Sequence, residues 1–436
     1  MIWAKEETLP RDEIEKIQLE KLKKTVPYIY ERVAPYRQKM DCAGVKPEDI
    51  RNLDDLKKLP FTYKADFRDH YPDGLFAVDK KEIVRYHASS GTTGKPTVVG
   101  YTKHDLDIWL DNVARIACMG GAGPDDVAQI SFGYGTFTGA LGLHGGLERI
   151  GAAVIPMSSG NTNKQIMFLQ DMGVTLLVAT PSYALHLGEE LRARGIDPSK
   201  DLKIHIGLFG GEGMTEPMRK EMHKVWGNQF ICTQNYGMVE LCGPGVAEEC
   251  TELCGMHINE DWFIPEIIDP ETEEVLPPGE TGELVITCLG KEALPLIRYR
   301  TGDLSKLMYE PCKCGRTTVR MENLSGRADD MLVIRGVNVF PTQIEEVLLK
   351  IEEIGPHYEI LVERKNRLDV MTITVELIDD RLLDSYAKLS ELEKRIKSAL
   401  KSQLGLATQI RLVAPNSLKR FEGKAKRVTD LRKDGL

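Results

Sequence analysis

The chain has 436 residues, of which 42% are hydrophobic and 28% are charged, and its formal net charge is −9. This length suggests about two to four domains with ordinary globular cores. The negative charge argues against a nucleic-acid-binding protein, which normally carries a basic face. No secretory signal begins the chain, and no apolar run approaches the length that a bilayer requires. We therefore expect a cytoplasmic protein that binds neither nucleic acid nor membrane.

The first forty residues predict a charged amphipathic helix with apolar positions such as Ile14, Leu22 and Val26. From Ile83 to Phe230, short apolar runs then alternate with helical patterns. The expected strands are Val127–Phe132, Ala152–Met157, Thr175–Ala179 and Ile204–Gly210, and the expected helices are Leu106–Met119, Lys164–Met172, Pro181–Arg194 and Glu216–Trp226. Such alternation predicts an α/β core with a parallel sheet.

The pattern changes after this core. Residues 245–326 predict a mainly antiparallel β subdomain, with strands at Glu266–Asp269, Glu283–Thr287 and Ser305–Tyr309. A small α+β unit follows, with expected elements at Met331–Ile334, Pro341–Leu349, Tyr358–Glu363, Asp369–Glu376, Ser385–Leu404 and Gln409–Val413. The predicted fold class is α/β. Its large N-terminal domain, 1–326, contains the parallel core and the β subdomain, and a small mobile C-terminal domain spans 327–436.

The clearest chemical segment is a glycine-rich loop. Its residues are Ser89, Ser90, Gly91, Thr92, Thr93, Gly94 and Lys95. Many backbone and hydroxyl donors around a cation suit a polyphosphate. Two residues separate the glycines, whereas a Walker A loop has four, and Pro96 leads into a strand-like run rather than a helix. The loop therefore joins two strands and could fold over a triphosphate; a flexible surface hairpin is the alternative.

This loop resembles the phosphate loop of the adenylate-forming superfamily, which includes acyl- and aryl-CoA ligases. Further similar motifs follow in the family's order: Gly210-Gly-Glu-Gly213, Asn235-Tyr-Gly-Met-Val-Glu240, Tyr299-Arg-Thr-Gly-Asp-Leu304, Gly326-Arg-Ala-Asp-Asp330 and Phe421-Glu-Gly-Lys-Ala-Lys-Arg427. The likeness covers nearly the whole chain. It is greatest to the phenylacetate–CoA ligase branch, whose characteristic strings recur at 71–78, 291–295 and 334–346.

The resemblance implies a role for each motif. Tyr236 would stack on the adenine, Glu240 would hold Mg²⁺ against the phosphates, and Asp303 would bind the ribose hydroxyls. Arg327 would contact the nucleotide, and Lys424 would be the catalytic lysine. The other residues implied to contact the nucleotide are Gly211, Glu212, Asn235, Gly237 and Met238. An aromatic face suits a base, and a hard cation prefers carboxylate oxygen.

The implied function is ATP-dependent acid–CoA ligation. A carboxylic acid and ATP would give an acyl-adenylate and pyrophosphate, and coenzyme A would then take the acyl group and release AMP. Positioning and electrostatic stabilisation would carry the first step. Rotation about a hinge at Asp329 would then present another face of the small domain to CoA. That face would carry Arg335, Gly336, Val337, Asn338 and Phe340.

The segment from Ser131 to Gly139 combines aromatic and small residues just after a predicted strand, where ligands usually dock in such sheets. It resembles the part of phenylacetate–CoA ligases that lines the aryl pocket, so Tyr134, Gly135 and Phe137 are candidate pocket residues. The resemblance thus implies a phenylacetate-like acid. Core packing, with glycines that let a helix approach closely, is the alternative.

Nine cysteines in so long a chain do not indicate a disulfide framework. Cys312 and Cys314 form a knuckle-like pair, and with Cys250 and His257 upstream they make a Cys₃His set typical of structural zinc. Cys254 is a competing third thiolate. Reduced thiols and a Cys312–Cys314 disulfide are the alternatives to a metal.

Two other functions remain open from the sequence. An adenylating ligase with an acceptor other than CoA would share every ATP motif, and a non-catalytic nucleotide-binding protein would be expected to lack one of the charged residues. The expected partners are small molecules, namely ATP, a carboxylic acid and CoA. The sequence does not choose between a monomer and a homodimer.

Overall fold

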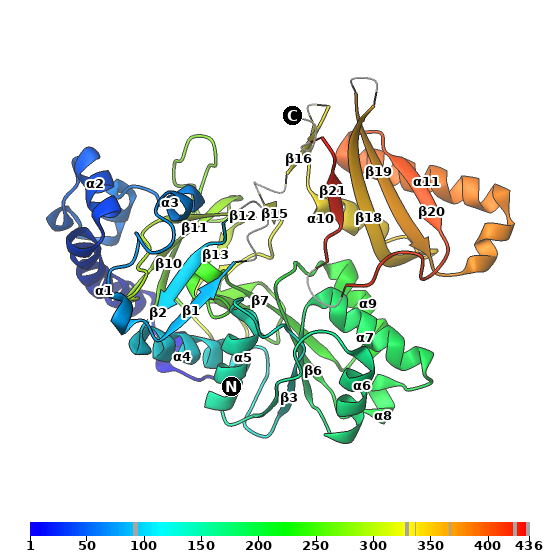
Figure 1. Ribbon diagram of the computed structural model, residues 1–436, viewed down its shortest axis with the longest axis horizontal. Helices are drawn as coiled ribbons and strands as arrows, with labels where there is room; N and C mark the ends of the chain where they lie inside the picture. Colours follow the sequence, from blue (N-terminus) through cyan, green and yellow to red (C-terminus); the bar gives the residue numbers. More distant parts are fainter. Residues whose placement is uncertain (90–94, 328–330, 336, 366–367, 422–424, 433–436) are drawn as a thin grey trace.

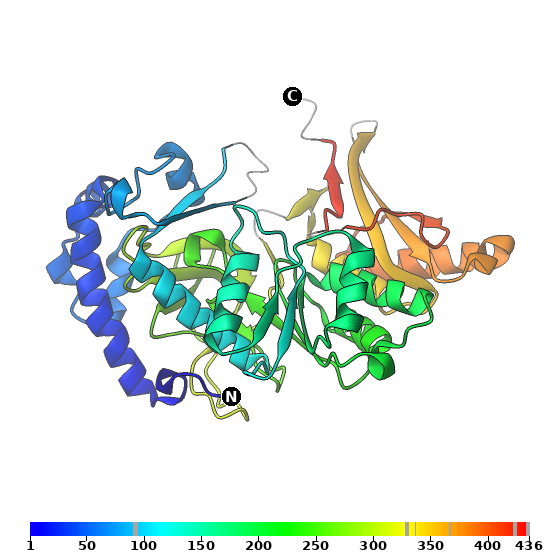
Figure 2. The same cartoon turned by 60° about the horizontal axis from the view of Figure 1, so that its bottom comes forward.

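The computed structural model describes residues 1–89, 95–327, 331–335, 337–365, 368–421 and 425–432. The N-terminal helices and the C-terminal part lie at opposite ends of the long axis, with the sheets between them (Figures 1 and 2). No helix in these ranges combines the length and the apolar character needed to cross a bilayer.

The first predicted helix is confirmed as two consecutive helices, α1 and α2. Ile14, Leu22 and Val26 are buried along α1, as the amphipathic pattern predicts. The elements before the glycine-rich loop are η1 (Lys5–Thr8), α1 (Arg11–Arg32), α2 (Ala34–Cys42), η2 (Pro47–Asp49), η3 (Leu53–Lys58), α3 (Lys64–Asp69) and η4 (Lys80–Glu82). A small antiparallel hairpin follows, of β1 (Arg85–Ala88) and β2 (Val98–Tyr101), so the loop does join two strands.

A nine-stranded sheet forms the centre of the molecule. Its order is β13-β14-β9-β8-β7-β6-β5-β3-β4, and the segment from β7 to β4 is parallel. The parallel strands are β3 (Val127–Ile130), β4 (Ala153–Ile155), β5 (Leu176–Ala179), β6 (Ile206–Phe209) and β7 (Ile231–Tyr236). The helices between and before them are α4 (Lys103–Met119), α5 (Gly139–Arg149), α6 (Thr162–Asp171), α7 (Pro181–Ala193), α8 (Pro198–Asp201) and α9 (Glu216–Trp226). The predicted parallel α/β core is confirmed.

Both faces of this sheet are buried, and β5 shows why. Alternate residues of a strand point to opposite faces. Leu176 and Val178 pack in a cluster with α4, whereas Leu177 and Ala179 pack in another with α7 and α9. A strand that is covered on both sides reads as a continuous apolar run, which is why the sequence pattern identified it.

The segment predicted as a β subdomain contributes to two sheets. A four-stranded antiparallel sheet has the order β10-β11-β12-β15, with β10 (Phe263–Ile268), β11 (Gly282–Cys288), β12 (Tyr299–Ser305) and β15 (Gly326–Arg327). The remaining strands extend the nine-stranded sheet: β8 (Ala247–Glu249), β9 (Met256–Ile258), β13 (Leu307–Met308) and β14 (Arg320–Met321). The single strand predicted at Ser305–Tyr309 is therefore wrong, because the chain leaves one sheet after Ser305 and joins the other at Leu307.

The C-terminal part has a hydrophobic cluster of its own, which spans Leu332 to Leu406. Its four-stranded sheet has the order β20-β19-β18-β21, and a separate hairpin of β16 and β17 leads into α10. The elements are β16 (Leu332–Ile334), β17 (Val337–Val339), α10 (Pro341–Leu348), β18 (Ile354–Lys365), β19 (Leu368–Leu377), η6 (Asp380–Asp384), α11 (Tyr386–Leu404), β20 (Gln409–Val413) and β21 (Val428–Asp430). This part lies beside α7 and α9 (Figure 1).

Candidate active site

The ends of the glycine-rich loop are held together by hydrogen bonds. Ser89 N–H donates to Thr97 O at 3.0 Å, and Thr97 N–H donates to Ser89 Oγ at 2.9 Å. Lys95 is exposed, with Nζ 4.8 Å from the ring centre of Tyr71. The predicted residues Ser90, Gly91, Thr92, Thr93 and Gly94 lie outside the described residues. The described ends therefore form the closed neck of a hairpin loop.

The carboxyl ends of β6 and β7 lie side by side, which brings two of the predicted nucleotide motifs together. Asn235 Nδ2 donates to Phe209 O at 2.9 Å. A Cβ added at Gly210 would lie 2.3 Å from Asn235 Oδ1, so only glycine fits there. Gly211 follows with φ +78°, a conformation that favours glycine. The two motifs thus make one compact turn at the sheet edge.

Three predicted residues from distant segments meet in one hydrogen-bonded group. The Tyr236 hydroxyl donates to Asp303 Oδ2 at 2.6 Å, and Arg327 Nη1 donates to Asp303 Oδ1 at 2.5 Å. Asp303 comes from β12 and Arg327 from β15, which pair in the antiparallel sheet. Burial, and then the Asp303 carboxylate, raise the pKa of Tyr236 well above its usual range. The phenol is therefore a hydrogen-bond donor that stays neutral.

Glu240 lies in the short helix η5 (Val239–Leu241) and is buried. Its backbone carbonyl accepts a 3.1 Å hydrogen bond from Lys291 Nζ, a buried amine for which the sequence had suggested no role. Burial, followed by the Glu240 carboxylate, raises the pKa of Tyr299 well above its usual range. Lys291 thus fixes the backbone of Glu240, whose buried carboxylate offers the oxygen ligands that a hard cation prefers.

The turn before Glu240 depends on close backbone contact. A Cβ added at Gly237 would lie 2.5 Å from Gly243 Cα, and Gly243 N–H donates to Met238 O at 2.7 Å. The predicted residues Gly237 and Met238 therefore shape the loop that positions Glu240. Met238 is half-buried against the main core.

The candidate acyl segment lies between β3 and α5. Tyr134 is half-buried, and its hydroxyl lies 2.9 Å from His144 Nδ1 on α5. Burial, followed by Glu148, raises the pKa of the Tyr134 phenol. Gly135 is exposed, and Phe137 is 45% exposed. Of the aromatic candidates, Tyr134 is thus fixed by its neighbours, whereas Phe137 has a largely exposed ring.

The predicted CoA-side residues follow the chain from β16 to α10. Arg335 adopts φ +51°, and its Nε donates to Asp369 O at 2.7 Å. Val337 and Asn338 belong to β17. The Phe340 ring packs against Gly326, where an added Cβ would lie only 2.5 Å from Phe340 Cδ1. Gly336 and the predicted hinge, Asp329, lie outside the described residues.

Lys424, the predicted catalytic lysine, also lies outside the described residues, but the residue after it is described. Ala425 N–H donates to Glu212 Oε1, and Glu212 accepts two more hydrogen bonds from Ser182, from N–H at 3.2 Å and from Oγ at 3.0 Å. The residue that follows Lys424 in the sequence and the predicted nucleotide motif at Glu212 are thus in direct contact.

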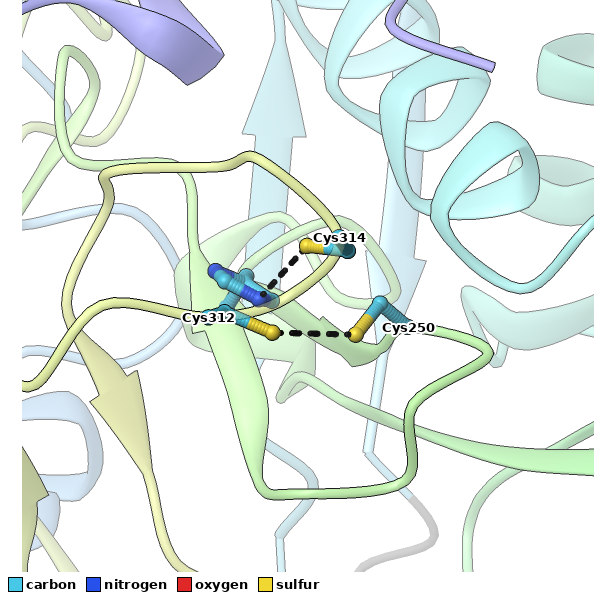
Figure 3. Close-up of side chains that lie close together, drawn as sticks. Cys250, Cys312 and Cys314 are labelled. Carbon is cyan, nitrogen blue, oxygen red and sulfur yellow. Dashed lines mark hydrogen bonds between the residues drawn. The ribbon is translucent and has the colours of Figure 1, made fainter.

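The predicted cysteine–histidine set is brought together beside β9 and β14, near one end of the nine-stranded sheet, and Figure 3 shows its three cysteines. One ligand atom from each of Cys250, His257, Cys312 and Cys314 lies within 4.8 Å of the others. Pairing of β9 with β14 closes the distance between the two segments. His257 Nε2 faces Cys314 Sγ at 3.4 Å, and Nδ1 lies 3.1 Å from Thr318 Oγ1. A second partner of this kind is what orients a metal-ligating histidine.

Cys254, the competing thiolate, is exposed, and its Sγ lies 3.4 Å from Cys312 Sγ. It is not in the group of four whose ligand atoms are mutually close. The structure therefore favours Cys250 over Cys254 as the third thiolate.

The residues that follow Cys314 hold the beginning of the chain. Arg316 Nε donates to Glu7 Oε2 at 2.7 Å, and Thr317 N–H donates to Glu7 O at 3.0 Å. Arg316 and Glu7 are both buried, so the ion pair is shielded from water. The cysteine loop is thus joined to the N-terminal segment.

Comparison with known proteins shows what this arrangement is. Residues 15–288 match the family model described as AMP-binding enzyme, and residues 336–432 match the AMP-binding enzyme C-terminal domain. Phenylacetate–coenzyme A ligases of Thermus thermophilus, Escherichia coli and Pseudomonas putida are 48%, 46% and 48% identical. Each alignment covers 98% of this chain and 96–98% of the relative. This chain belongs to the phenylacetate–CoA ligase family.

The family fixes the chemistry. The chain is an ATP-dependent, AMP-forming acid–CoA ligase that forms an acyl-adenylate and transfers the acyl group to CoA. The function predicted from the motifs is confirmed, and so are ATP and CoA as its substrates.

Solved structures of a ligase in this superfamily distinguish two states. A 2-hydroxyisobutyryl-CoA ligase in the postadenylation state, in complex with R3-HIB-AMP, gives a TM-score of 0.91 at 27% identity, covering 98% of this chain and 92% of that one. The same ligase with CoA in the thioesterification state gives 0.72 at 28% identity, with the same coverage. The predicted fold is confirmed, and this phenylacetate–CoA ligase family member is more similar in structure to the postadenylation state of that ligase than to its thioesterification state.

Proposed function

We propose that the acid is an arylacetic acid of the phenylacetate type. The observation that carries this proposal is the 45–48% identity, over nearly full length, to four proteins named phenylacetate–coenzyme A ligases. Tyr134 and Phe137, next to the start of α5, would supply aromatic walls for the ring. Both side chains are aromatic and uncharged, which suits an apolar aryl group.

An acid panel tests this proposal. Pyrophosphate release is measured with ATP and each of phenylacetate, benzoate, 2-hydroxyisobutyrate and hexanoate, with and without CoA. We expect phenylacetate to give the largest kcat/KM by at least tenfold. A larger value for either aliphatic acid would contradict the proposed acyl group.

In the proposed mechanism, the carboxylate of the acid attacks the α-phosphate of ATP, and pyrophosphate leaves. Glu240 would hold Mg²⁺, which supplies positive charge beside the phosphates. Asp303 would bind the ribose, Tyr236 would stack on the adenine, and Arg327 would contact the nucleotide. Lys424 would stabilise charge that develops on the phosphates. Fixed donors and charges of this kind act without reorganising in the transition state.

The second half-reaction would use a different orientation of the C-terminal part. We take residues 1–326 and 327–436 as the two moving domains, with Asp329 as the hinge. The separate hydrophobic cluster of the C-terminal part and the TM-scores of 0.91 and 0.72 for two states of one ligase support this division. After rotation, the segment from Arg335 to Phe340 would face the CoA thiol.

Replacement of the lysine tests the two orientations separately. Lys424→Ala should lower adenylation, measured as acid-dependent ATP–pyrophosphate exchange, by about 10²-fold or more. Thioester formation from supplied acyl-adenylate and CoA should stay within about threefold of the wild type. Equal loss of both half-reactions would overturn the two-orientation mechanism.

The cysteine–histidine cluster would hold a structural Zn²⁺. Three thiolates and one imidazole in a closed set are a usual zinc environment, and four protein ligands leave no position for substrate. Metal analysis of protein purified without chelator should give about one zinc per chain. Less than about 0.2 zinc per chain would exclude this role.

A further inference from the structure

One buried carboxylate joins the C-terminal part to the N-terminal part. Glu345 lies on α10 and is 8% exposed. Its Oε2 accepts hydrogen bonds from the Tyr358 hydroxyl, at 3.0 Å, and from Arg427 Nη1. Its Oε1 accepts a 3.2 Å hydrogen bond from Thr215 Oγ1, across the contact between the two parts.

The Glu345–Arg427 pair is shielded from water. Burial by itself would lower the pKa of Arg427, but Tyr358 and Glu345 raise it overall. Burial, and then Glu345, raise the pKa of Tyr358. Removing one member of a buried ion pair leaves the other charge without compensation, which strongly disfavours that arrangement. The ion pair thus keeps the guanidinium of Arg427 next to the carboxylate of Glu345.

Thr215 is held equally firmly on the other side. It is the N-cap of α9, and its Oγ1 accepts a 3.3 Å hydrogen bond from Met218 N–H. The same hydroxyl donates a hydrogen bond to Glu345 Oε1. Thr215 lies two residues after Gly213, the end of the motif that contains Glu212. The carboxylate of Glu345 is therefore hydrogen-bonded to the N-terminus of α9, an element of the central α/β core.

Arg427 and Ala425 bracket a three-residue stretch that directly follows Lys424. Arg427 is fixed by Glu345, and Ala425 by Glu212. Two carboxylates, one on each side of the contact, thus hold residues 425–427.

We infer that Glu345 is a positioning residue for adenylation: it couples residues 425–427, which follow Lys424 in the sequence, to α9, through its contacts with Arg427 and Thr215. This inference rests on the proposed role of Lys424 and on the proposed rotation of the C-terminal part. Rotation would carry Glu345 away from Thr215 while Arg427 and Tyr358 move with it. The link across the contact then belongs to the adenylation orientation alone.

Half-reaction measurements on Glu345→Gln test the inference. Gln has the same shape but leaves Arg427 without its counter-charge. We expect acid-dependent ATP–pyrophosphate exchange to fall about 10- to 100-fold, and thioester formation from supplied acyl-adenylate to change less than threefold. Glu346→Gln is the matched control, since Glu346 is the exposed neighbour on the same helix. Equal loss in both half-reactions, or unchanged exchange, would refute the positioning role.

Thr215 provides a second test that leaves the C-terminal part intact. Thr215→Asp keeps a good helix cap but sets a second carboxylate against Glu345. We expect a fall in exchange of about tenfold, recovered in Thr215→Ser, which keeps the hydroxyl. In the Glu345→Gln background the Asp substitution should cost less than threefold. Strictly multiplicative effects would show that the two residues act independently and would refute the coupling.

The same assays separate this inference from the proposed function. A wild-type protein that gives no exchange with any arylacetic acid would contradict the proposed acid. A Lys424→Ala variant with normal exchange would contradict the proposed lysine. Neither result resembles the pattern that would refute Glu345 alone, namely an active, lysine-dependent wild type whose Glu345 variant loses both half-reactions equally.

Discussion

Two sites share the nine-stranded sheet, and they are built in opposite ways. At the carboxyl ends of β6 and β7, the nucleotide residues form hydrogen bonds to partners from distant segments, as Tyr236 does to Asp303. At the other end of the sheet, Cys250, His257, Cys312 and Cys314 converge on one point. The polar groups of the first site would thus stay in position for a nucleotide that binds and leaves, whereas the second site would enclose its metal ion with four protein ligands.

This difference has a practical meaning for mutations. Changes at the nucleotide site should affect catalysis with little effect on stability, and changes at the cysteine cluster should do the reverse. Between them lies Glu248 on β8, which pairs with Asn235 on one side and with His257 on the other. Three substitutions, one at each place, test the contrast.

The largest effect should come from Asp303→Asn. The carboxylate accepts hydrogen bonds from Tyr236 and Arg327. Asn keeps one accepting oxygen, so about one charged hydrogen bond, worth about 1.5–3 kcal/mol, would be lost. We expect kcat/KM for ATP to fall about 10²-fold, with the thermal midpoint lowered by less than about 4 °C. Asp171→Asn, at an exposed position of α6, is the control. A large loss of stability with normal kcat/KM would reverse the contrast.

The next effect should appear in stability. Cys314→Ser removes one proposed ligand of the cluster. A loss of about 3 kcal/mol would lower the thermal midpoint by roughly 4–5 °C in a domain of this size. Zinc content should fall, while kcat of the folded protein stays within about twofold. Cys254→Ser is the matched control and should keep both metal and midpoint. If Cys254→Ser lost zinc and Cys314→Ser did not, the assignment of the ligands would be wrong.

The smallest effect should be a pH dependence from Glu248. Burial raises the pKa of this carboxyl well above its usual range. The stability that its neutral form contributes is complete below about pH 4, the unfolded pKa, and is lost as the pH rises above it. Glu248→Gln lacks this loss, so its thermal midpoint should rise relative to the wild type between pH 5 and pH 8. For Glu274→Gln, at an exposed position, the difference in thermal midpoint from the wild type should stay constant between pH 5 and pH 8.

Local sequence signals predicted the elements they directly control. α9 begins and ends where predicted, because Thr215 caps it and Gly227 follows its last residue, Trp226. The cysteine cluster was predicted because few residue types bind zinc, so the candidate ligands can be found in the sequence. β20 was likewise predicted with the correct bounds.

Helix α5 was not predicted, because glycine is a poor helix former and α5 contains four of them. The structure shows why they are there. A Cβ at Gly142 would lie 2.7 Å from Trp109, and one at Gly146 would lie 2.4 Å from Val113, so glycine lets α5 pack closely on α4. Tertiary packing overrides propensity here, and a single sequence does not reveal it.

The links between motifs were also beyond the sequence. Tyr236 and Asp303 are 67 residues apart, and Glu345 and Thr215 are 130 apart. In the sequence each of these residues is an ordinary polar side chain, and only the fold shows which partner it contacts. Resemblance identified Tyr236 and Asp303 one by one, but it gave no indication of their hydrogen bond or of a role for Glu345.

The buried ion pair of Glu7 and Arg316 can form only late in synthesis, because its two residues are far apart in the sequence. Glu7 leaves the ribosome 309 residues before its partner. At about 5–20 residues per second, the delay is roughly 15–60 s. During this time the start of the chain has no cysteine loop to bind, so the first segment to be made is among the last to reach its final place. A nascent chain stalled before residue 316 should therefore carry an N-terminal segment that proteases still cleave.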